Sequence, residues 1–201
     1  MTLPTVKMST TAAASFLSGS QIAAPAQGSN SLFLKFDAKR TGEWLLGPGA
    51  DPVTDEVFSL DLASLKHGYV LWHNRKPTRA FAPINQPLPV APDPIDSDQP
   101  NEARSLEGIF IDGQQFQLEV STVGGRNAVD RLIGEMAARS NSGSPYLFPQ
   151  VKLAAGSYEH DSYGTVFTPE LAPVAWFDGE GNEEALLEEE EAPKPRKRRG
   201  A

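Results

Sequence analysis

The sequence predicts a mainly β domain that contains one helix. Several segments rich in Val, Leu, Phe and Tyr alternate apolar with polar residues, and short turns rich in Gly, Asn and Asp separate them. One longer segment has helical periodicity instead. Because a single helix cannot cover both faces of a parallel sheet, this pattern disfavours a doubly wound fold.

The first strands are expected soon after residue 30. "SLFLKFD" (31–37) alternates in polarity, and "EWLLG" (43–47) supplies a short partner across the turn "AKRTG". "EVFSLDLASLKHGYVLWHN" (56–74) predicts a long strand that is bent or interrupted near Gly68. "RAFAPIN" (79–85) is expected to pair with that strand across the turn "NRKPT".

The next segment is an extended loop, followed by a hairpin. Prolines at positions 87, 89, 92 and 94 deprive Gln86–Gln99 of the donors that a strand ladder needs. After this loop, "SLEGIFI" and "QQFQLEVST" flank Asp112 and Gly113, which is the strongest hairpin signal in the chain.

The predicted helix lies in "GGRNAVDRLIGEMAARSNSG" (124–143). Val129, Leu132, Ile133 and Met136 form one apolar stripe at helical spacing. Either Thr122 or Asn127 could cap its start. The segment 150–177 is expected to add two or three strands.

These elements favour a small antiparallel barrel with one helix that plugs or flanks it. Among such barrels the OB-fold, a five-stranded and partly open architecture, is the leading candidate. A β-sandwich is the alternative, because the order of elements suits both. The predicted domain spans residues 31–177, between a disordered N-terminal arm (1–30) and a disordered tail (178–201) in which an acidic block precedes "KPRKRRGA".

Composition limits the class of protein. The chain has no cysteine, which excludes a disulfide framework and a thiolate metal site and fits a reducing cytoplasm. No apolar run reaches 18 residues, so we expect no membrane span. "TAAASFLSG" imitates a secretory signal, but its apolar core is short and interrupted by Ser.

Catalytic groups are sparse. His67, His73 and His160 are the only histidines, and no hydrolase, metalloprotease or P-loop motif is present. We therefore expect a protein that is not an enzyme and holds no metal or cofactor. "STVGGRNAV" (121–129) could be a tight strand-to-helix turn, or it could hold an anion with the help of Arg126.

Charge is segregated along the chain. The chain has 26 acidic and 18 basic side chains, so its overall field does not favour nucleic acid. However, no Asp or Glu occurs in residues 62–92, here called the acid-free window, and this window contains Lys66, Arg75, Lys76, Arg79 and the rings of Tyr69, Trp72 and Phe81. Core strands flanked by solvated charge would explain it. A surface for single-stranded nucleic acid would explain it too, because bases stack on aromatic rings while Lys and Arg contact phosphates.

The landmarks, in order, resemble those of OB-fold single-stranded-DNA-binding proteins encoded by tailed bacteriophages and prophages. They are "FLKFD", the Gly42–Trp44 segment, "HGYVLW", "STVGGRNAVDRLIGE", and "YGTVFTPEL" with "VAWF", and they span Ser31 to Phe177. The resemblance implies sequence-independent, non-catalytic binding of single-stranded DNA during phage DNA replication or recombination, in the cytoplasm of the bacterial host.

On this interpretation, the expected stacking residues are Trp72 or Tyr69, together with Trp44. The expected phosphate contacts are Lys66, Arg75, Lys76, Arg79 and Arg126. The acidic tail would compete with DNA for this surface or bind replication or recombination proteins, although in this chain a basic tip follows it, unlike in many such binders. An oligomer is compatible with the sequence. The alternative function is a structural or adaptor protein of the virion or replisome that acts through protein contacts of the β-barrel and the Pro-rich loop.

Overall fold

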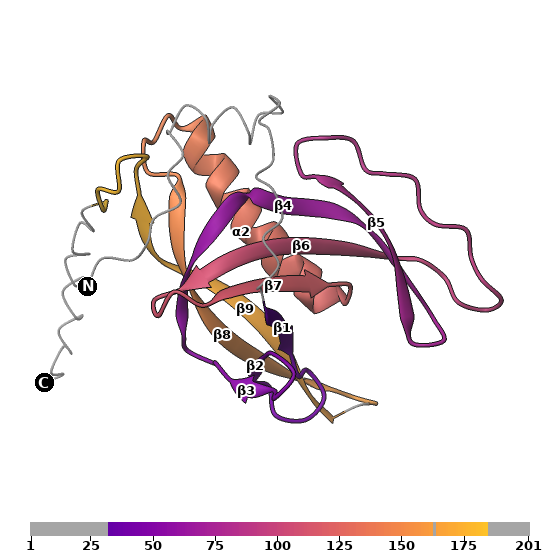
Figure 1. The fold of residues 1–201 in the computed structure, drawn as a ribbon. Helices are drawn as coiled ribbons and strands as arrows, with labels where there is room; N and C mark the ends of the chain where they lie inside the picture. The colour runs from indigo at the N-terminus through magenta and orange to yellow at the C-terminus, as the bar shows by residue number, and fades with distance from the viewer. Residues whose placement is uncertain (1–31, 163, 185–201) are drawn as a thin grey trace, which may run out of the picture.

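The computed structural model describes residues 32–162 and 164–184, in which nine strands form one mixed sheet beside one helix (Figure 1). The predicted disordered N-terminal segment (1–30) and the tail beyond Glu184 lie outside these residues. The elements are β1 (Leu32–Phe36), β2 (Trp44–Leu46), β3 (Asp51–Pro52), β4 (Val57–His73), β5 (Lys76–Pro83), β6 (Asn101–Phe110), β7 (Gln115–Val120), α2 (Val123–Asn141), β8 (Phe148–His160) and β9 (Gly164–Phe177). The prediction of a mainly β fold with one helix is confirmed, whereas a second sheet, as in a sandwich, is not seen in the described residues.

The sheet is open but strongly rolled. Its strand order is β3-β2-β1-β7-β6-β4-β8-β9, with β5 paired to β4, and the β1–β7 pair is parallel while the other pairs are antiparallel. The two ends of this order nevertheless meet. Trp44 of β2 donates its indole N–H to the carbonyl of Ala154 in β8 at 2.7 Å, and the Phe167 amide of β9 donates to Ala38 at 3.4 Å. The result is a partly open barrel.

Strand β4 is shared between two parts of the domain. Its first half pairs with β6 and β8, and its second half pairs with β6 and β5. The irregularity between Asp61 and Lys66 separates the halves, so the strand is interrupted earlier than the predicted position near Gly68. The second half, with β5 and the following loop, projects from the barrel (Figure 1). We call residues 66–100 the arm.

The interruption changes which side chains of β4 face the core. Between the pairs Asp61–Glu107 and Lys66–Ser105, β4 advances by five residues while β6 advances by two. The excess is odd, so the alternation of faces inverts. Phe58 and Leu60 point into the core before the irregularity, whereas the even-numbered residues after it point to the opposite face of the sheet.

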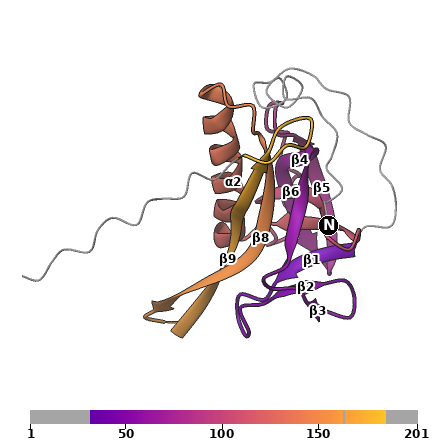
Figure 2. The ribbon, with the colours of Figure 1, turned by 90° about the vertical axis from the view of Figure 1, so that its left-hand side faces the viewer.

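The core lies between the sheet and α2, as Figure 2 shows from the side. Phe58, Phe110 and Phe116 form its aromatic centre, with ring centroids 4.7 to 6.3 Å apart. The residue beneath them, Gly108, has no side chain, and a Cβ at this position would approach the rings of Phe116 and Phe58 to 2.6 and 2.7 Å. Only glycine leaves room for both rings. Burial of these rings stabilises the fold.

Helix α2 covers one side of the barrel and packs chiefly against β9. Its N-cap is Thr122, whose hydroxyl accepts a hydrogen bond from the Gly125 amide, so the alternative cap Asn127 is wrong. Of the predicted stripe, Val129, Leu132 and Met136 are buried, while Ile133 packs at the edge.

The domain extends beyond its predicted end at Phe177. Asp178 accepts backbone hydrogen bonds from Glu180 and Asn182, and the Glu184 amide donates to Trp176. The Glu184 carboxylate also pairs with Arg139 at 2.7 Å, and the guanidinium of Arg139 lies 4.0 Å from the centroid of the Trp176 ring. These contacts fix residues 178–184 on the domain, and this corrects the prediction that the disordered tail starts at Asp178.

The arm depends on a glycine at position 68, where β4 and β5 approach closely. A Cβ on Gly68 would lie 1.9 Å from the carbonyl oxygen of Ala80, which is a backbone atom and cannot move aside. We predict that Gly68→Ala lowers the free energy of unfolding by more than about 1 kcal/mol, through displacement of β5. Denaturant unfolding measures this change.

Gly134→Ala is the matched control, because a Cβ there meets nothing within 4 Å on the helix surface. This second variant is expected to gain about 0.4–1 kcal/mol of stability. Equal stability of Gly68→Ala and the wild type would contradict the close approach of the two strands.

Candidate nucleic-acid interface

The candidate interface is the face of the sheet that points away from the core, here called the outer face. Residues that pair directly across two strands point to the same face of the sheet, so the register of the pairs shows which residues lie on the outer face. Val70 pairs with Arg79 and Asn101, Lys66 pairs with Ser105 and Pro83, and Ser105 pairs with Glu119. From the acid-free window the outer face therefore receives Lys66, Val70, Trp72, Arg79 and Phe81.

The end of the arm carries an exposed ring and two exposed cations close to it in the chain, although Lys76 pairs with His73 and so lies on the face opposite to Trp72. Trp72 is 49% exposed, and Arg75 and Lys76 are also exposed. Asn74 and Arg75 form the two-residue turn between β4 and β5, with φ angles of 49° and 63°. This is the backbone that favours Asn-Gly, so Arg75 occupies a position where glycine would be less strained. Trp72, Arg75 and Lys76 are called the Trp72 patch.

The window is free of acids in the sequence but not in space. Arg79 donates to Glu119 of β7 at 2.7 Å, and Nδ1 of His73 donates to Asp98 at 3.0 Å. Both acids come from segments outside the window. Arg79 is therefore neutralised by an ion pair and is a weaker candidate for phosphate than its sequence context predicts.

The Arg79–Glu119 pair also shows how strongly the outer face is curved. Two strands, β4 and β6, lie between β5 and β7, which are about 14 Å apart in a flat sheet. The register adds a displacement of four residues along β6, or roughly 13 Å. Two side chains cannot span that diagonal in a flat sheet, so the outer face is concave between the arm and β7.

Lys66 and Tyr69 hold less favourable positions than Trp72. Lys66 is half-buried and lies close to Asp61. Burial raises the pKa of the Asp61 carboxyl, and attraction to Lys66 offsets only part of this effect. Tyr69 points to the other face of β4, opposite Glu102, and is partly buried. The structure therefore does not place Tyr69 beside Trp72.

Trp44 is not available for stacking on a base. Its side chain is 1% exposed, contacts the Phe36 ring at a centroid distance of 5.1 Å, and uses its only donor on Ala154. The expectation that Trp44 contributes to the interface is therefore wrong. Its role is to join the two ends of the rolled sheet.

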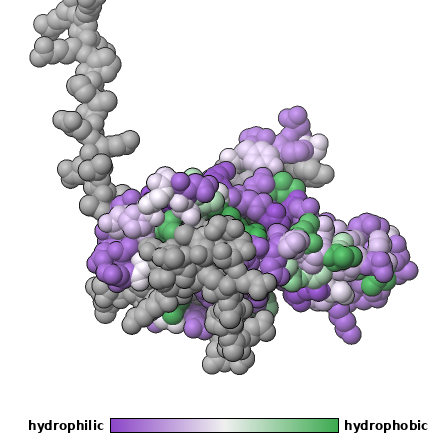
Figure 3. All heavy atoms as spheres, turned by 90° about the horizontal axis from the view of Figure 1, so that it is seen from above, coloured by the Kyte–Doolittle hydropathy of each residue, from purple (hydrophilic) through white to green (hydrophobic). Residues whose placement is uncertain are grey.

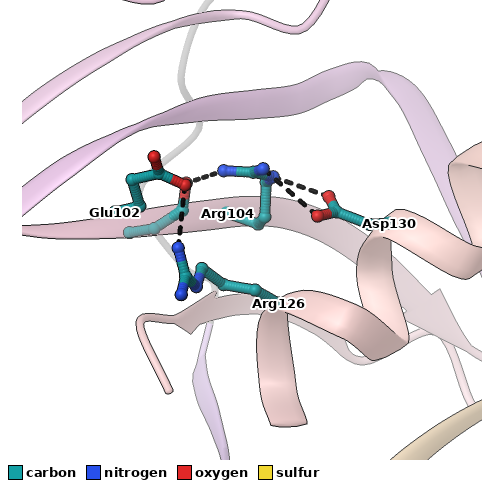
Figure 4. A network of polar contacts seen from close by, with 5 residues as sticks. Glu102, Arg104, Arg126 and Asp130 are labelled. Carbon is teal, nitrogen blue, oxygen red and sulfur yellow. Dashed lines mark hydrogen bonds and ion pairs between the residues drawn. The ribbon is translucent and has the colours of Figure 1, made fainter. Parts of the chain in front are cut away.

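Arg126 lies in a polar network at the start of α2, on the face of β6 opposite to the outer face (Figure 4). It donates to Glu102 at 2.8 Å, and Arg104 donates twice to Asp130 at 2.7 and 3.2 Å. Nε of Arg126 is buried without a hydrogen-bond partner. Since its charge is already paired, the structure does not bring Arg126 to the other predicted phosphate contacts.

Gly125, the residue before Arg126, has a structural explanation. A Cβ on Gly125 would lie 2.8 Å from Cβ of Val120, so the chain needs glycine to turn from β7 into the helix. Of the two interpretations of this motif, the geometry favours a tight strand-to-helix turn.

The Pro-rich loop is bound to β4 at both of its ends. Nε2 of His67 donates to the Gln86 carbonyl at 2.8 Å, and His73 bonds Asp98 near the start of β6. Between these anchors the loop exposes apolar side chains, and the projecting lobe shows hydrophobic spots on a hydrophilic surface (Figure 3). The exposed apolar residues are Leu88 at 42%, Val90 at 91% and Ile95 at 39%.

Sequence reasoning missed a second group of cations beside an exposed ring. Phe33 of β1 is 57% exposed, and Lys35, Lys39 and Arg40 are exposed close to it in the chain. None of the ion pairs in the described residues includes these three cations, nor do any include Arg75 or Lys76. The missed signal was the alternation in "SLFLKFD", which places Phe33 and Lys35 opposite to the buried Leu34.

Within the described residues, no group of three or more His, Asp or Glu side chains has the geometry of a metal site. No helix there is long and apolar enough to cross a membrane. No protein-family model matches the chain, and comparison with curated proteins and with solved structures gives no significant match.

The raised pKa of Asp61 leads to a prediction about stability. The folded state holds the proton of Asp61 more tightly than the unfolded state does, so stability is lost as the pH rises from the unfolded pKa through the folded one. We predict that Asp61→Asn is more stable than the wild type at neutral pH, since Asn can still accept the Ala63 amide. The difference should vanish at about pH 3, where Asp61 is protonated in both states.

Urea unfolding at the two pH values measures the difference. Asp93→Asn in the exposed loop is the control for the loss of one negative charge. A lower stability of Asp61→Asn at neutral pH would show that attraction to Lys66 outweighs the cost of burial.

Proposed function

We propose that the protein binds single-stranded DNA without catalysis and largely without sequence preference, through the outer face of its arm. The observation that carries this proposal is the Trp72 patch, in which a half-exposed indole is followed within four residues by two exposed cations that form no ion pair within the described residues. A ring of this kind stacks on any base, and the cations follow the phosphates.

The position of the patch supports the same proposal. In OB-folds, oligonucleotides bind on the face of strands 2 and 3 and at the loops that join strands 1 to 2 and 4 to 5. If β4, β6, β7, β8 and β9 are taken as the five barrel strands, the arm is the connection between the first two of them. This argument is an analogy of architecture, and the chemistry of Trp72, Arg75 and Lys76 makes it specific.

The biological setting comes from the resemblance of the sequence to phage and prophage proteins. On that basis we propose a role in phage DNA replication or recombination, in the cytoplasm of the bacterial host. Replication or recombination proteins are the proposed partners of the acidic segment beyond Glu184, which lies outside the described residues.

A second function is supported by a separate observation, the exposed apolar loop. A valine that is 91% exposed in a loop anchored at both ends is a favourable contact for another protein. An adaptor of the virion or replisome would use Leu88, Val90 and Ile95 and would be indifferent to oligonucleotide. Val90→Asp would then abolish partner binding and leave DNA binding unchanged.

The first test of the proposed function is Trp72→Ala. We predict that labelled oligo-dT binds the wild type, and that Trp72→Ala weakens binding at least about fivefold, since a lost stack costs about 1–3 kcal/mol. Fluorescence anisotropy measures the affinity. Because Trp44 and Trp176 are buried, oligo-dT should also quench the emission of Trp72 selectively.

Tyr158→Ala is the matched control, because Tyr158 is 51% exposed on the β8–β9 hairpin, away from the arm. Binding should also weaken steeply with added salt, as condensed ions are released from the phosphates. Absence of binding at low salt would refute the proposal, as would equal losses in the two variants.

Arg75→Gly separates binding from folding. Glycine relieves the positive φ of 63°, so we predict that the variant is at least as stable as the wild type and binds oligo-dT more weakly. The slope of log affinity against log salt should fall in magnitude by about 0.7, the value for one phosphate contact on a single strand.

Arg131→Ala, on the exposed surface of α2, is the charge-matched control and should leave the salt slope unchanged. If Arg75→Gly keeps wild-type affinity, Arg75 serves only the turn and the proposed site loses one of its two cations.

A further inference from the structure

We propose that the same single strand is bound at a second patch, formed by Phe33, Lys35, Lys39 and Arg40 and here called the Phe33 patch. The inference rests on the proposed function and extends it from one contact to two. It follows from the face on which these residues lie, from their exposure and from the charges around them.

The register places Phe33 and Trp72 on the same face of one sheet. Phe33 pairs with Gln117 of β7, and Gln117 pairs with Glu107 of β6. Glu107 shares the outer face of β6 with Ser105, which pairs with Lys66 of β4. Trp72 alternates onto the same side as Lys66. The neighbouring pair Leu34–Leu118 is buried, which confirms that Phe33 points outward.

The two rings are too far apart for one base to touch both. Three strand spacings and about eight residues along β6 separate them, which is at most about 30 Å on a flat sheet. Curvature of the outer face shortens this path. A strand of several nucleotides can span it, within the roughly 4 to 16 nucleotides that one OB-fold binds.

Charge explains why two patches are expected rather than one continuous track. The middle of the outer face carries Asp61, Glu107 and Glu119 against Lys66 and Arg79, so its formal charge is negative, and of these acids only Glu119 forms an ion pair within the described residues, with Arg79. Phosphates are repelled there and attracted at the two ends. At the Phe33 end, the loop carries two acids, Asp37 and Glu43, neither of which forms an ion pair within the described residues. Asp37 accepts the backbone amides of Lys39 and Arg40, and the side chains of both cations are exposed.

The two patches also combine the same kinds of side chain, an exposed ring and exposed cations. Phe33 is 57% exposed and Trp72 is 49% exposed, and each is within seven residues of at least two exposed cations in the chain. An aromatic face among cations is the combination that binds a single strand regardless of its sequence. No polar group that would read a particular base is required at either patch.

The experiment compares oligo-dT of two lengths. An oligonucleotide of about 5 nucleotides covers roughly 14 Å at the stacked spacing and reaches one patch, whereas one of about 20 nucleotides reaches both. We expect Phe33→Ala to weaken the longer oligonucleotide at least about fivefold and the shorter one much less. Trp72→Ala should weaken both.

Two further variants of Phe33 separate stacking from general hydrophobic contact. Phe33→Leu keeps the apolar bulk without a ring and should behave like Phe33→Ala. Phe33→Trp in a Trp72→Phe background keeps a ring at both positions and should therefore bind the longer oligonucleotide, unlike Phe33→Ala. The emission of its new indole should be quenched by that oligonucleotide. Unfolding curves of all variants should match, because the side chain at this position is exposed.

The charges are tested by the double variant Lys39→Ala with Arg40→Ala, with Arg131→Ala as control. The salt slope for the longer oligonucleotide should fall in magnitude by about 1.4 for two lost phosphate contacts, with no change in the control. Wild-type affinity of Phe33→Ala for the longer oligonucleotide would overturn the second patch while leaving the first intact. If neither oligonucleotide binds the wild type, the proposed function itself fails.

Discussion

The structure depends on the pairing of β4 with β6, which continues through the barrel and into the arm. On one side of the irregularity the two strands carry Phe58 and Phe110, the aromatic centre of the core. On the other side Gly68 pairs with Ala103, and the missing side chain of Gly68 lets β5 lie close. The arm therefore inherits its rigidity from the same ladder that organises the core, and an interface on the arm is positioned by the barrel rather than by a free loop.

The irregularity in β4 decides which residues are available for binding. Its odd excess of residues inverts the alternation, so that Trp72 points outward although Phe58 and Leu60, which also have even numbers, point inward. Ser64 holds this geometry by donating to the Asp61 carbonyl at 2.6 Å and accepting the Glu107 amide at 2.7 Å. Leu62 and Leu65 fill the core from within it. Asp61 is partly buried as a consequence, which raises its pKa.

The elements of the fold followed from the sequence, but their partners did not. The Asp112–Gly113 hairpin, the helix and the short strand at Trp44 were predictable because turn residues and periodicity are local signals. The parallel β1–β7 pair was not, since pairing between distant segments leaves no local pattern. The face of Trp72 was equally hidden, because nothing in "DLASLK" reveals that its excess of residues is odd.

The same distinction applies to the candidate site. Exposure of Arg75 and Lys76 was predictable from a turn between strands, whereas neutralisation of Arg79 and Arg126 required Glu119 and Glu102, which come from other strands. Trp44 was misjudged because an aromatic ring next to a glycine turn is equally typical of a core and of a surface, and only its bond to Ala154 distinguishes the two. An acid-free stretch of sequence is thus not an acid-free surface.

The distribution of ion pairs indicates where an acidic protein can still meet a polyanion. Of the twelve Lys and Arg side chains in the described residues, five form ion pairs, and of the other seven only Lys66 and Arg131 lie outside the Trp72 and Phe33 patches. Acids elsewhere on the domain repel a nucleic-acid strand from most of the surface. On the proposed function, attraction would therefore be concentrated at two places, the end of the arm and the start of the β1–β2 segment, each of which offers a ring. This arrangement would limit where a strand can lie without any reading of its sequence, and it would make the proposed binding depend on local charge while the net charge remains negative.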